Sequence, residues 1–270
     1  MENILIAVLY GAVQGVAEFL PISSSGHLAV FHRFLPLATE NELAFDVALH
    51  FATLAAVVFY FWKDIVLLFT AWLSSLRGQG SANSRLAWLI ILATIPAAVF
   101  GKLLDDWVEN ELRSPFLIAF MLAAVGALFL LAERKSSQES GLENLDWRKS
   151  FLIGLAQALA LVPGTSRSGI TIIAGMFSGL KREAAVRFSF LLMLPITFGA
   201  GMTKAPEAIG SLRDMDDVMV LSAAFLSAAV FGLLSVRFLV GYARGHRLDI
   251  FAYYRFALSA LIVVLNSFAI

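Results

Sequence analysis

Two short polar segments interrupt otherwise apolar sequence, and they carry the side chains that could do chemistry. The first runs from Glu18 through Pro21 and three serines to His27. The second is Pro163-Gly-Thr-Ser-Arg-Ser-Gly169, with Arg167 at its centre. Ionisable groups inside apolar sequence are costly to bury, so they mark candidate functional sites. A structural ion pair between Glu18 and Arg167 is the alternative interpretation.

Both segments predict the N-terminus of a helix. Proline disrupts a continuing helix, and serines are favoured where a new helix begins. The start of a helix offers free backbone N–H groups and the positive end of the helix dipole, and arginine binds oxyanions such as phosphate in a bidentate manner. The alternative is that the serines only cap their helices. The predicted phosphate-binding residues are Ser23, Ser24, Ser25, Thr165, Ser166, Arg167 and Ser168.

Glu18 follows Gln14 by four residues, so the two side chains share one face of a helix. Their oxygen atoms suit a hard divalent cation, Mg²⁺ or Ca²⁺, with phosphate oxygens completing the coordination, and we expect Glu18 and Gln14 to be its ligands. Alternatively, Glu18 is a general base, and His27 takes or donates a proton. Serine becomes a nucleophile once a base removes its proton, so an activated serine is a further expectation.

Composition identifies the setting of these segments. Hydrophobic residues make up 59% of the 270 residues and charged residues 15%, against roughly 45–50% and about 25% in soluble domains. Twenty basic and twenty acidic side chains balance, so no basic surface predicts nucleic-acid binding. The sequence predicts an all-α integral membrane protein that crosses the bilayer several times.

Apolar runs long enough to span a bilayer of about 30 Å require about 20 residues. A shorter apolar stretch at 64–76 is expected to be interfacial or a short helix. The segments at about 4–36 and 150–180 are each broken by proline and polar residues, and they predict re-entrant hairpins whose tips meet. The six predicted spans lie at 43–61, 86–101, 115–132, 184–202, 218–240 and 250–268.

The two hairpins also resemble each other. Gly11-x-x-Gln14 in the first returns as Gly154-x-x-Gln157 in the second, 143 residues later. Each hairpin precedes three predicted spans, and an odd number of spans inserts the second copy upside down, which predicts two inverted repeats as in many transporters. The predicted organisation is one membrane domain, 1–270, with repeats at 1–133 and 150–270.

Positive charge predicts the orientation. Fourteen of the twenty Lys and Arg residues, Arg255 among them, fall on one predicted side and five on the other, with Arg167 between them. The positive-inside rule assigns the fourteen to the cytoplasm. The first hairpin then opens outward, the second opens inward, and the candidate site faces the extracytoplasmic side.

Three sequence motifs resemble one known family. Gln14-Gly-Val-Ala-Glu18 followed by Pro21-Ile-Ser-Ser-Ser-Gly-His27 resembles the (E/Q)xxxE and PxSS(T/S)GH signature of bacterial undecaprenyl-diphosphatases, the bacitracin-resistance family. Pro163-Gly-Thr-Ser-Arg-Ser-Gly169 resembles that family's PGxSRSG signature, and Arg187-Phe-Ser-Phe-Leu-Leu192 is similar to its (E/R)FSFLL stretch. The resemblance extends over the whole chain.

This resemblance implies hydrolysis of undecaprenyl diphosphate to undecaprenyl phosphate and inorganic phosphate. The reaction would take place at the outer face of the bacterial plasma (inner) membrane. It would recycle the lipid carrier for peptidoglycan and confer resistance to bacitracin. The implied partners are the bilayer and a polyprenyl diphosphate lipid, and the sequence leaves open whether two copies form a homodimer.

The resemblance also implies residue roles. Ser24 would be the nucleophile or a hydroxyl that positions water, Glu18 with Gln14 the acid–base or metal pair, and His27 an assisting group. Arg167, with Thr165 and Ser166, would hold the phosphates. Many members have Glu where this chain has Gln14, and an amide cannot accept a proton, so Glu18 would carry most of that role.

Transport is the main alternative to hydrolysis. Inverted repeats, broken helices and an anion site within the membrane also suit an alternating-access carrier that flips a prenyl phosphate. A carrier, however, has no need of a serine flanked by a carboxylate and a histidine. Release of phosphate in detergent, where no second compartment exists, discriminates between the two.

Overall fold

The computed structural model describes residues 2–35, 42–112, 114–210, 212 and 215–267. Within these ranges the chain is helical, apart from turns, loops and a single isolated bridge between Ser140 and Leu180. The α-helices are α1 (Glu2–Phe19), α2 (Ser24–Phe34), α3 (Glu42–Tyr60), α4 (Trp62–Ser75), α5 (Ala82–Glu111), α6 (Pro115–Lys135), α7 (Trp147–Ala158), α8 (Arg167–Phe177), α9 (Arg182–Gly210), α10 (Met215–Gly245) and α11 (Asp249–Ser267). Residues 36 and 268, at the ends of the predicted first hairpin and last span, lie outside the described ranges, as do the ends of the predicted domain, 1 and 270.

Among the described residues, five helices are long and apolar enough to cross a membrane: α5, α6, α9, α10 and α11. The predicted span at 86–101 belongs to the apolar part of α5, which covers Ala82–Leu104. The predicted span at 43–61 corresponds to α3, which passes the same test for a membrane span together with α4, and the two helices are bent by 83° relative to each other. The part of the chain that the structure describes therefore contains five candidate spans, or the predicted six if the bent pair counts as one.

The bend between α3 and α4 lies at Phe61, whose backbone leaves the helical conformation at φ −99° and ψ 18°. The Phe61 side chain is buried. Arg187 of α9 lies over its ring and donates a hydrogen bond of 2.8 Å to Asp64 in the first turn of α4. The bend is thus held in place by a contact between distant parts of the chain.

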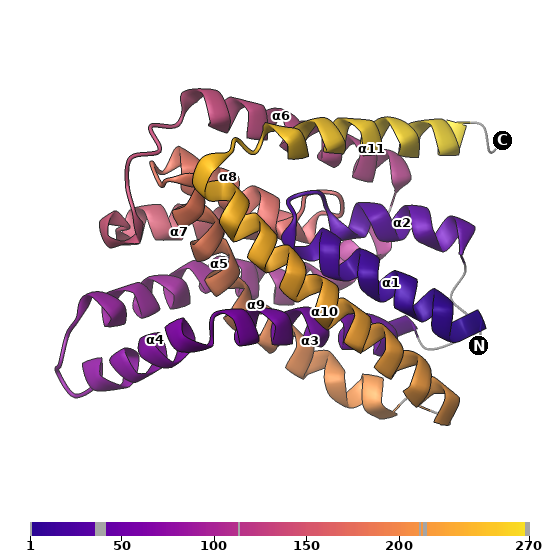
Figure 1. The fold of residues 1–270 in the computed structure, drawn as a ribbon, viewed down its shortest axis with the longest axis horizontal. Coiled ribbons are helices and arrows are strands. Elements are labelled where there is room, and N and C mark those ends of the chain that lie inside the picture. The colour runs from indigo at the N-terminus through magenta and orange to yellow at the C-terminus, as the bar shows by residue number, and fades with distance from the viewer. Residues whose placement is uncertain (1, 36–41, 113, 211, 213–214, 268–270) are drawn as a thin grey trace.

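The two predicted hairpins are formed by α1 with α2 and by α7 with α8. In Figure 1, α1 runs inward from one end of the molecule and α2 returns toward that same end. For the second hairpin, Ser140, ahead of α7, pairs with the segment after α8: Ser140 N donates to Gly179 O and Lys181 N donates to Ser140 O. Each hairpin therefore enters and leaves at one end of the molecule.

Packing between the two halves is reciprocal. The first helix of each hairpin packs against a long helix of the opposite half, α1 against α10 and α7 against α5. The other large contacts pair α3 with α10, α6 with α11 and α3 with α9. The start of α1 and the end of α11 lie at one end of the molecule, whereas the turn between α4 and α5 and the connection from α6 to α7 lie at the other (Figure 1).

Candidate active site

The site is built on two loops that end in matching helix starts. α2 and α8 have 11 residues each, and each is capped by a serine whose Oγ accepts the backbone N–H three residues later: Ser23 from Gly26 and Ser166 from Gly169. Ser23 and Ser166 have φ values of 75° and 69°. Positive φ is unfavourable for serine and persists only where the surroundings impose it, and such strain concentrates at functional sites.

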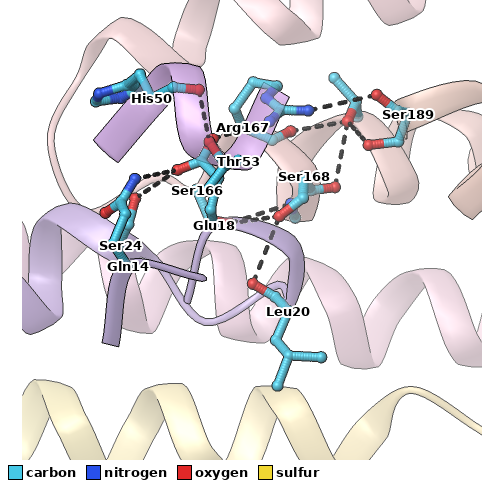
Figure 2. Close-up of polar contacts among 12 residues, drawn as sticks. Gln14, Glu18, Leu20, Ser24, His50, Thr53, Ser166, Arg167, Ser168 and Ser189 are labelled. Atoms are coloured by element: carbon cyan, nitrogen blue, oxygen red, sulfur yellow. Dashed lines mark hydrogen bonds and ion pairs between the residues drawn. The ribbon is translucent and has the colours of Figure 1, made fainter. Parts of the chain in front are cut away.

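Glu18, at the end of α1, is the centre of the polar network (Figure 2). Its Oε1 accepts a hydrogen bond of 2.9 Å from Arg167 Nη2, and its Oε2 accepts bonds from Ser24 Oγ at 3.0 Å and Gln14 Nε2 at 3.2 Å. The side chains of Glu18 and Arg167 are 10% and 14% exposed. The Glu18–Arg167 ion pair of the alternative interpretation thus forms between the hairpins, and Ser24 lies where a carboxylate could take its proton.

Arg167 is oriented from behind by α8 and α9. Its Nη1 donates to the Ser189 carbonyl at 3.4 Å, and its own carbonyl accepts a 2.7 Å hydrogen bond from Thr171 Oγ1. Thr171 and Ser189 are buried and joined by a 2.7 Å hydrogen bond between their hydroxyl groups. This support fixes the direction of the guanidinium while leaving other N–H donors available.

The two loop tips are joined directly, as the sequence predicts. Ser25 Oγ accepts the Gly164 N–H at 3.0 Å and also lies 3.1 Å from Ser23 Oγ. From the other side, Ser168 Oγ donates to the Leu20 carbonyl at 3.5 Å. Loop geometry in one hairpin therefore depends on the other.

The predicted phosphate-binding hydroxyls fall into two groups. Ser24, Ser25 and Ser166 are partly exposed and can meet a substrate. Ser23, Thr165 and Ser168 are fully buried, and Thr165 Oγ1 has no hydrogen-bond partner. In the described conformation, these buried residues shape the loops rather than line an accessible surface. Their assignment as phosphate ligands stays a prediction.

His27 uses both of its ring nitrogens in contacts away from Glu18. Nδ1 lies 2.7 Å from the Ser23 carbonyl, and Nε2 lies 2.7 Å from the hydroxyl of Tyr254. The two rings are stacked with centroids 5.6 Å apart. This geometry fixes the loop before α2 and leaves no free ring nitrogen for proton transfer at Glu18.

The position of Arg255 in α11 differs most from the interpretation of the sequence. The charge count assigned it to the cytoplasmic side, but the residue is completely buried, with 0% exposed. Its guanidinium donates to the Pro21 carbonyl of the first loop at 3.2 Å, and to the Gly164 and Thr165 carbonyls of the second loop at 2.8 and 3.0 Å. Because it belongs to no motif and follows two tyrosines in an apolar helix, only the presence of a charge within a span could have signalled it.

His50 of α3 also lies at the site, although no sequence pattern assigned it a role. Its side chain lies near Glu18, with which it interacts electrostatically (Figure 2). The signal that could have found it is weak, because His50 follows an ordinary apolar helical pattern with no motif around it. Two of the functional candidates, Arg255 and His50, therefore come from the structure alone.

The donor atoms around Glu18 limit how a metal could bind. Among the described residues, no group of three or more His, Asp or Glu side chains is arranged to hold an ion. Both Glu18 oxygens already accept hydrogen bonds, and the buried Gln14 Oε1 is the unpartnered oxygen beside them. One carboxylate and one amide fit a cation whose other ligands are substrate phosphate and water, and they do not fit an ion held by the protein alone.

The fold and the site together define a helical membrane protein with a polar site between two hairpins. Comparison with known proteins is consistent with this class: residues 7–261 match the family model described as Bacitracin resistance protein BacA. The chain belongs to this family. It is 45% identical to an undecaprenyl-diphosphatase of Rubrobacter xylanophilus, over 98% of this chain and 99% of the relative. Proteins of the same name from Moorella thermoacetica and Methanosphaera stadtmanae are 43% and 38% identical, over 97% and 98% of this chain and 97% and 99% of theirs.

Proposed function

We propose that this chain hydrolyses undecaprenyl diphosphate to undecaprenyl phosphate and inorganic phosphate. The observation that carries the proposal is the network in which one carboxylate, Glu18, accepts hydrogen bonds from both Ser24 and Arg167. A base beside a hydroxyl, with a guanidinium within the same network, is the arrangement that phosphoryl transfer requires. The names of the relatives supply the substrate.

In the proposed reaction, an oxygen nucleophile attacks the terminal phosphorus and the bridging P–O bond breaks. The leaving group is the prenyl phosphate, which keeps the bridging oxygen. Glu18 takes the proton of the nucleophile, which is either Ser24 Oγ or a water that Ser24 positions. In the serine route, water then attacks the phosphoserine and releases phosphate.

Arg167 and the two helix starts would stabilise the charge that develops on the phosphoryl oxygens. The guanidinium has five N–H donors, so it can bind phosphate while still paired with Glu18. The first turns of α2 and α8 add backbone N–H groups and positive dipole ends. Ser25 and Ser166 are the remaining partly exposed hydroxyls at these starts, and we propose them as phosphate ligands. His27 would assist by holding the loop.

We propose that a divalent cation, Mg²⁺ or Ca²⁺, enters as part of the diphosphate substrate. Gln14 Oε1 and Glu18 are the protein oxygens that would meet it. The cation would neutralise charge on the phosphates, and the residues around it would keep the roles given above.

We also propose that the two halves are inverted repeats. Three observations support this proposal: the matching 11-residue helices, the matching Ser23 and Ser166 caps, and the reciprocal packing of α1 on α10 and α7 on α5. Both contacts use a glycine without room for a side chain. A Cβ on Gly11 would collide with the Ala224 carbonyl of α10, and a Cβ on Gly154 would collide with the Ala93 carbonyl of α5.

The proposed location is the bacterial inner membrane, with the site facing the extracytoplasmic side. Basic residues support this orientation, because Arg77 in the α4–α5 turn and Arg134, Lys135, Arg148 and Lys149 around the α6–α7 connection lie opposite the open end of the first hairpin. Hydrolysis there would return the lipid carrier to peptidoglycan synthesis and confer bacitracin resistance. A homodimer stays an open question.

The test is release of inorganic phosphate from undecaprenyl diphosphate by purified protein in detergent, with and without Mg²⁺ or Ca²⁺. We expect wild type to release phosphate and Arg167→Ala to lose at least about 100-fold in kcat. Arg237→Ala is the matched control, since Arg237 is exposed on α10 and none of the hydrogen bonds or ion pairs described for either loop involves it. A folded wild type that releases no phosphate with either cation would refute the proposal and favour the transporter alternative. Near-normal turnover by Arg167→Ala would remove Arg167 from the site.

A further inference from the structure

The position of His50 suits contact with a substrate better than a role in the packing of the fold. It is exposed, although it lies in the middle of α3, where the flanking Leu49 and Phe51 are buried and partly buried. Figure 2 shows its ring on one side of the Glu18 carboxylate and the Arg167 side chain on the other. Glu18 interacts electrostatically with both groups.

The orientation of the His50 ring is fixed by its own helix. Nδ1 lies 2.7 Å from the Asp46 carbonyl one turn earlier, and a carbonyl oxygen can only accept, so Nδ1 carries a proton. The backbone is held as well, because the fully buried Thr53 donates a 2.9 Å hydrogen bond to the His50 carbonyl. No hydrogen bond to Nε2 exists among the described residues.

The two histidines of the site therefore differ in what they can offer. Both ring nitrogens of His27 already form hydrogen bonds, with Ser23 and Tyr254. His50 uses one nitrogen, and its Nε2 has no hydrogen bond among the described residues. Because Nδ1 is held by the Asp46 carbonyl, Nε2 is the ring nitrogen left to form a hydrogen bond with a substrate oxygen.

We propose that His50 is a substrate-binding residue whose Nε2 forms a hydrogen bond with an oxygen of the diphosphate, on the side of the site away from Arg167. A diphosphate carries more negative charge than one guanidinium neutralises, and charge-assisted hydrogen bonds to phosphate are the strong kind. This inference rests on the proposed function, because the ligand is the substrate of that reaction.

The experiment compares His50→Ala and His50→Gln with wild type in the phosphate-release assay, with kcat and KM determined separately. We expect His50→Ala to raise KM about tenfold, the value of one charge-assisted hydrogen bond, and to leave kcat within about twofold. His50→Gln keeps a side-chain group that can form a hydrogen bond with phosphate, so its KM should fall between the two. His246→Ala is the control, since His246 lies in the turn after α10 and stacks on Tyr242.

Binding of inorganic pyrophosphate, measured by calorimetry on the detergent-solubilised protein, gives a second readout that needs no turnover. We expect His50→Ala to weaken it by a factor similar to the rise in KM. An unchanged KM and unchanged pyrophosphate affinity would overturn the inference while wild-type hydrolysis kept the proposed function intact. A fall in kcat at constant KM would also overturn it, in favour of a proton-transfer role. If wild type releases no phosphate, pyrophosphate affinity that depends on His50 would still support the site contact. Should His50→Ala not fold, His50→Gln decides by the same two measurements.

Discussion

Replacing Arg255 by lysine should separate the two loop tips without removing the buried charge. Arg255 donates hydrogen bonds to five carbonyl oxygens, and three of these belong to the loops of the two hairpins. A lysine ammonium has three N–H groups on a single nitrogen, so it cannot reach both loops and α6 at once. The expected result is a protein that folds but holds Glu18 and Arg167 in a looser arrangement.

The size of the effect follows from the bonds that are lost. At least two of the five carbonyls lose their donor, and each lost hydrogen bond with a buried unsatisfied carbonyl is worth about 1–2 kcal/mol. The free energy of unfolding should therefore fall by about 2–4 kcal/mol. Misplacement of a catalytic group by about 1 Å reduces turnover by about 100-fold, so we expect kcat to fall by a factor of that order.

The matched control is Ser259→Ala, one helical turn beyond Arg255 on the same face of α11. Ser259 Oγ donates a 2.6 Å hydrogen bond to the Ala119 carbonyl of α6 and does not contact the loops. It should lose about 1 kcal/mol of stability and keep its turnover. The assay combines unfolding in mixed detergent micelles with phosphate release. The reasoning is refuted if Arg255→Lys keeps the turnover of Ser259→Ala once both are compared under conditions where they are fully folded.

Three further predictions concern single side chains. Ser24→Ala should reduce kcat by at least about 100-fold. Ser23→Ala removes a helix cap, so it should lower the free energy of unfolding by about 1 kcal/mol and reduce kcat less. Equal losses of kcat in the two variants would mean that Ser24 only positions the loop. Gln14→Glu should preserve or raise the stimulation by Mg²⁺ in a cation titration of phosphate release, and complete inactivity would show that a neutral amide is required. Glu133→Gln breaks the buried ion pair with Arg182. It should lower the free energy of unfolding by about 3 kcal/mol and leave kcat unchanged. A large loss of kcat would contradict a purely structural role for Glu133.

The hairpins and their meeting could be predicted because their signals are local. Proline, glycine and clustered serines interrupt apolar sequence at Pro21 and Pro163, and helix ends respond to such residues directly. The pairing of Glu18 with Arg167 was the alternative interpretation of these two charges, and its basis is the high cost of leaving either charge alone in an apolar setting. The structure confirms that the two tips meet.

The remaining features depend on contacts between distant residues, which no local pattern reveals. The break at Phe61 lies in Tyr-Phe-Trp without proline or glycine, and Arg187 and Asp64 hold it from different helices. Arg255 was assigned by a charge count that assumes basic residues lie in water. That assumption fails when backbone carbonyls of two broken helices satisfy a guanidinium inside the protein.

The hydrogen bond from Gly164 N to Ser25 Oγ has a consequence for how this chain can change over time. The oxygen comes from the first hairpin and the N–H from the second. Each half therefore depends on the other half for a hydrogen bond that holds its loop. A substitution that shifts Ser25 alters a backbone position 139 residues away in sequence, and the two hairpins must tolerate mutations jointly. If the halves arose from one ancestral segment, that ancestor had to associate with a second copy of itself before it could build this site.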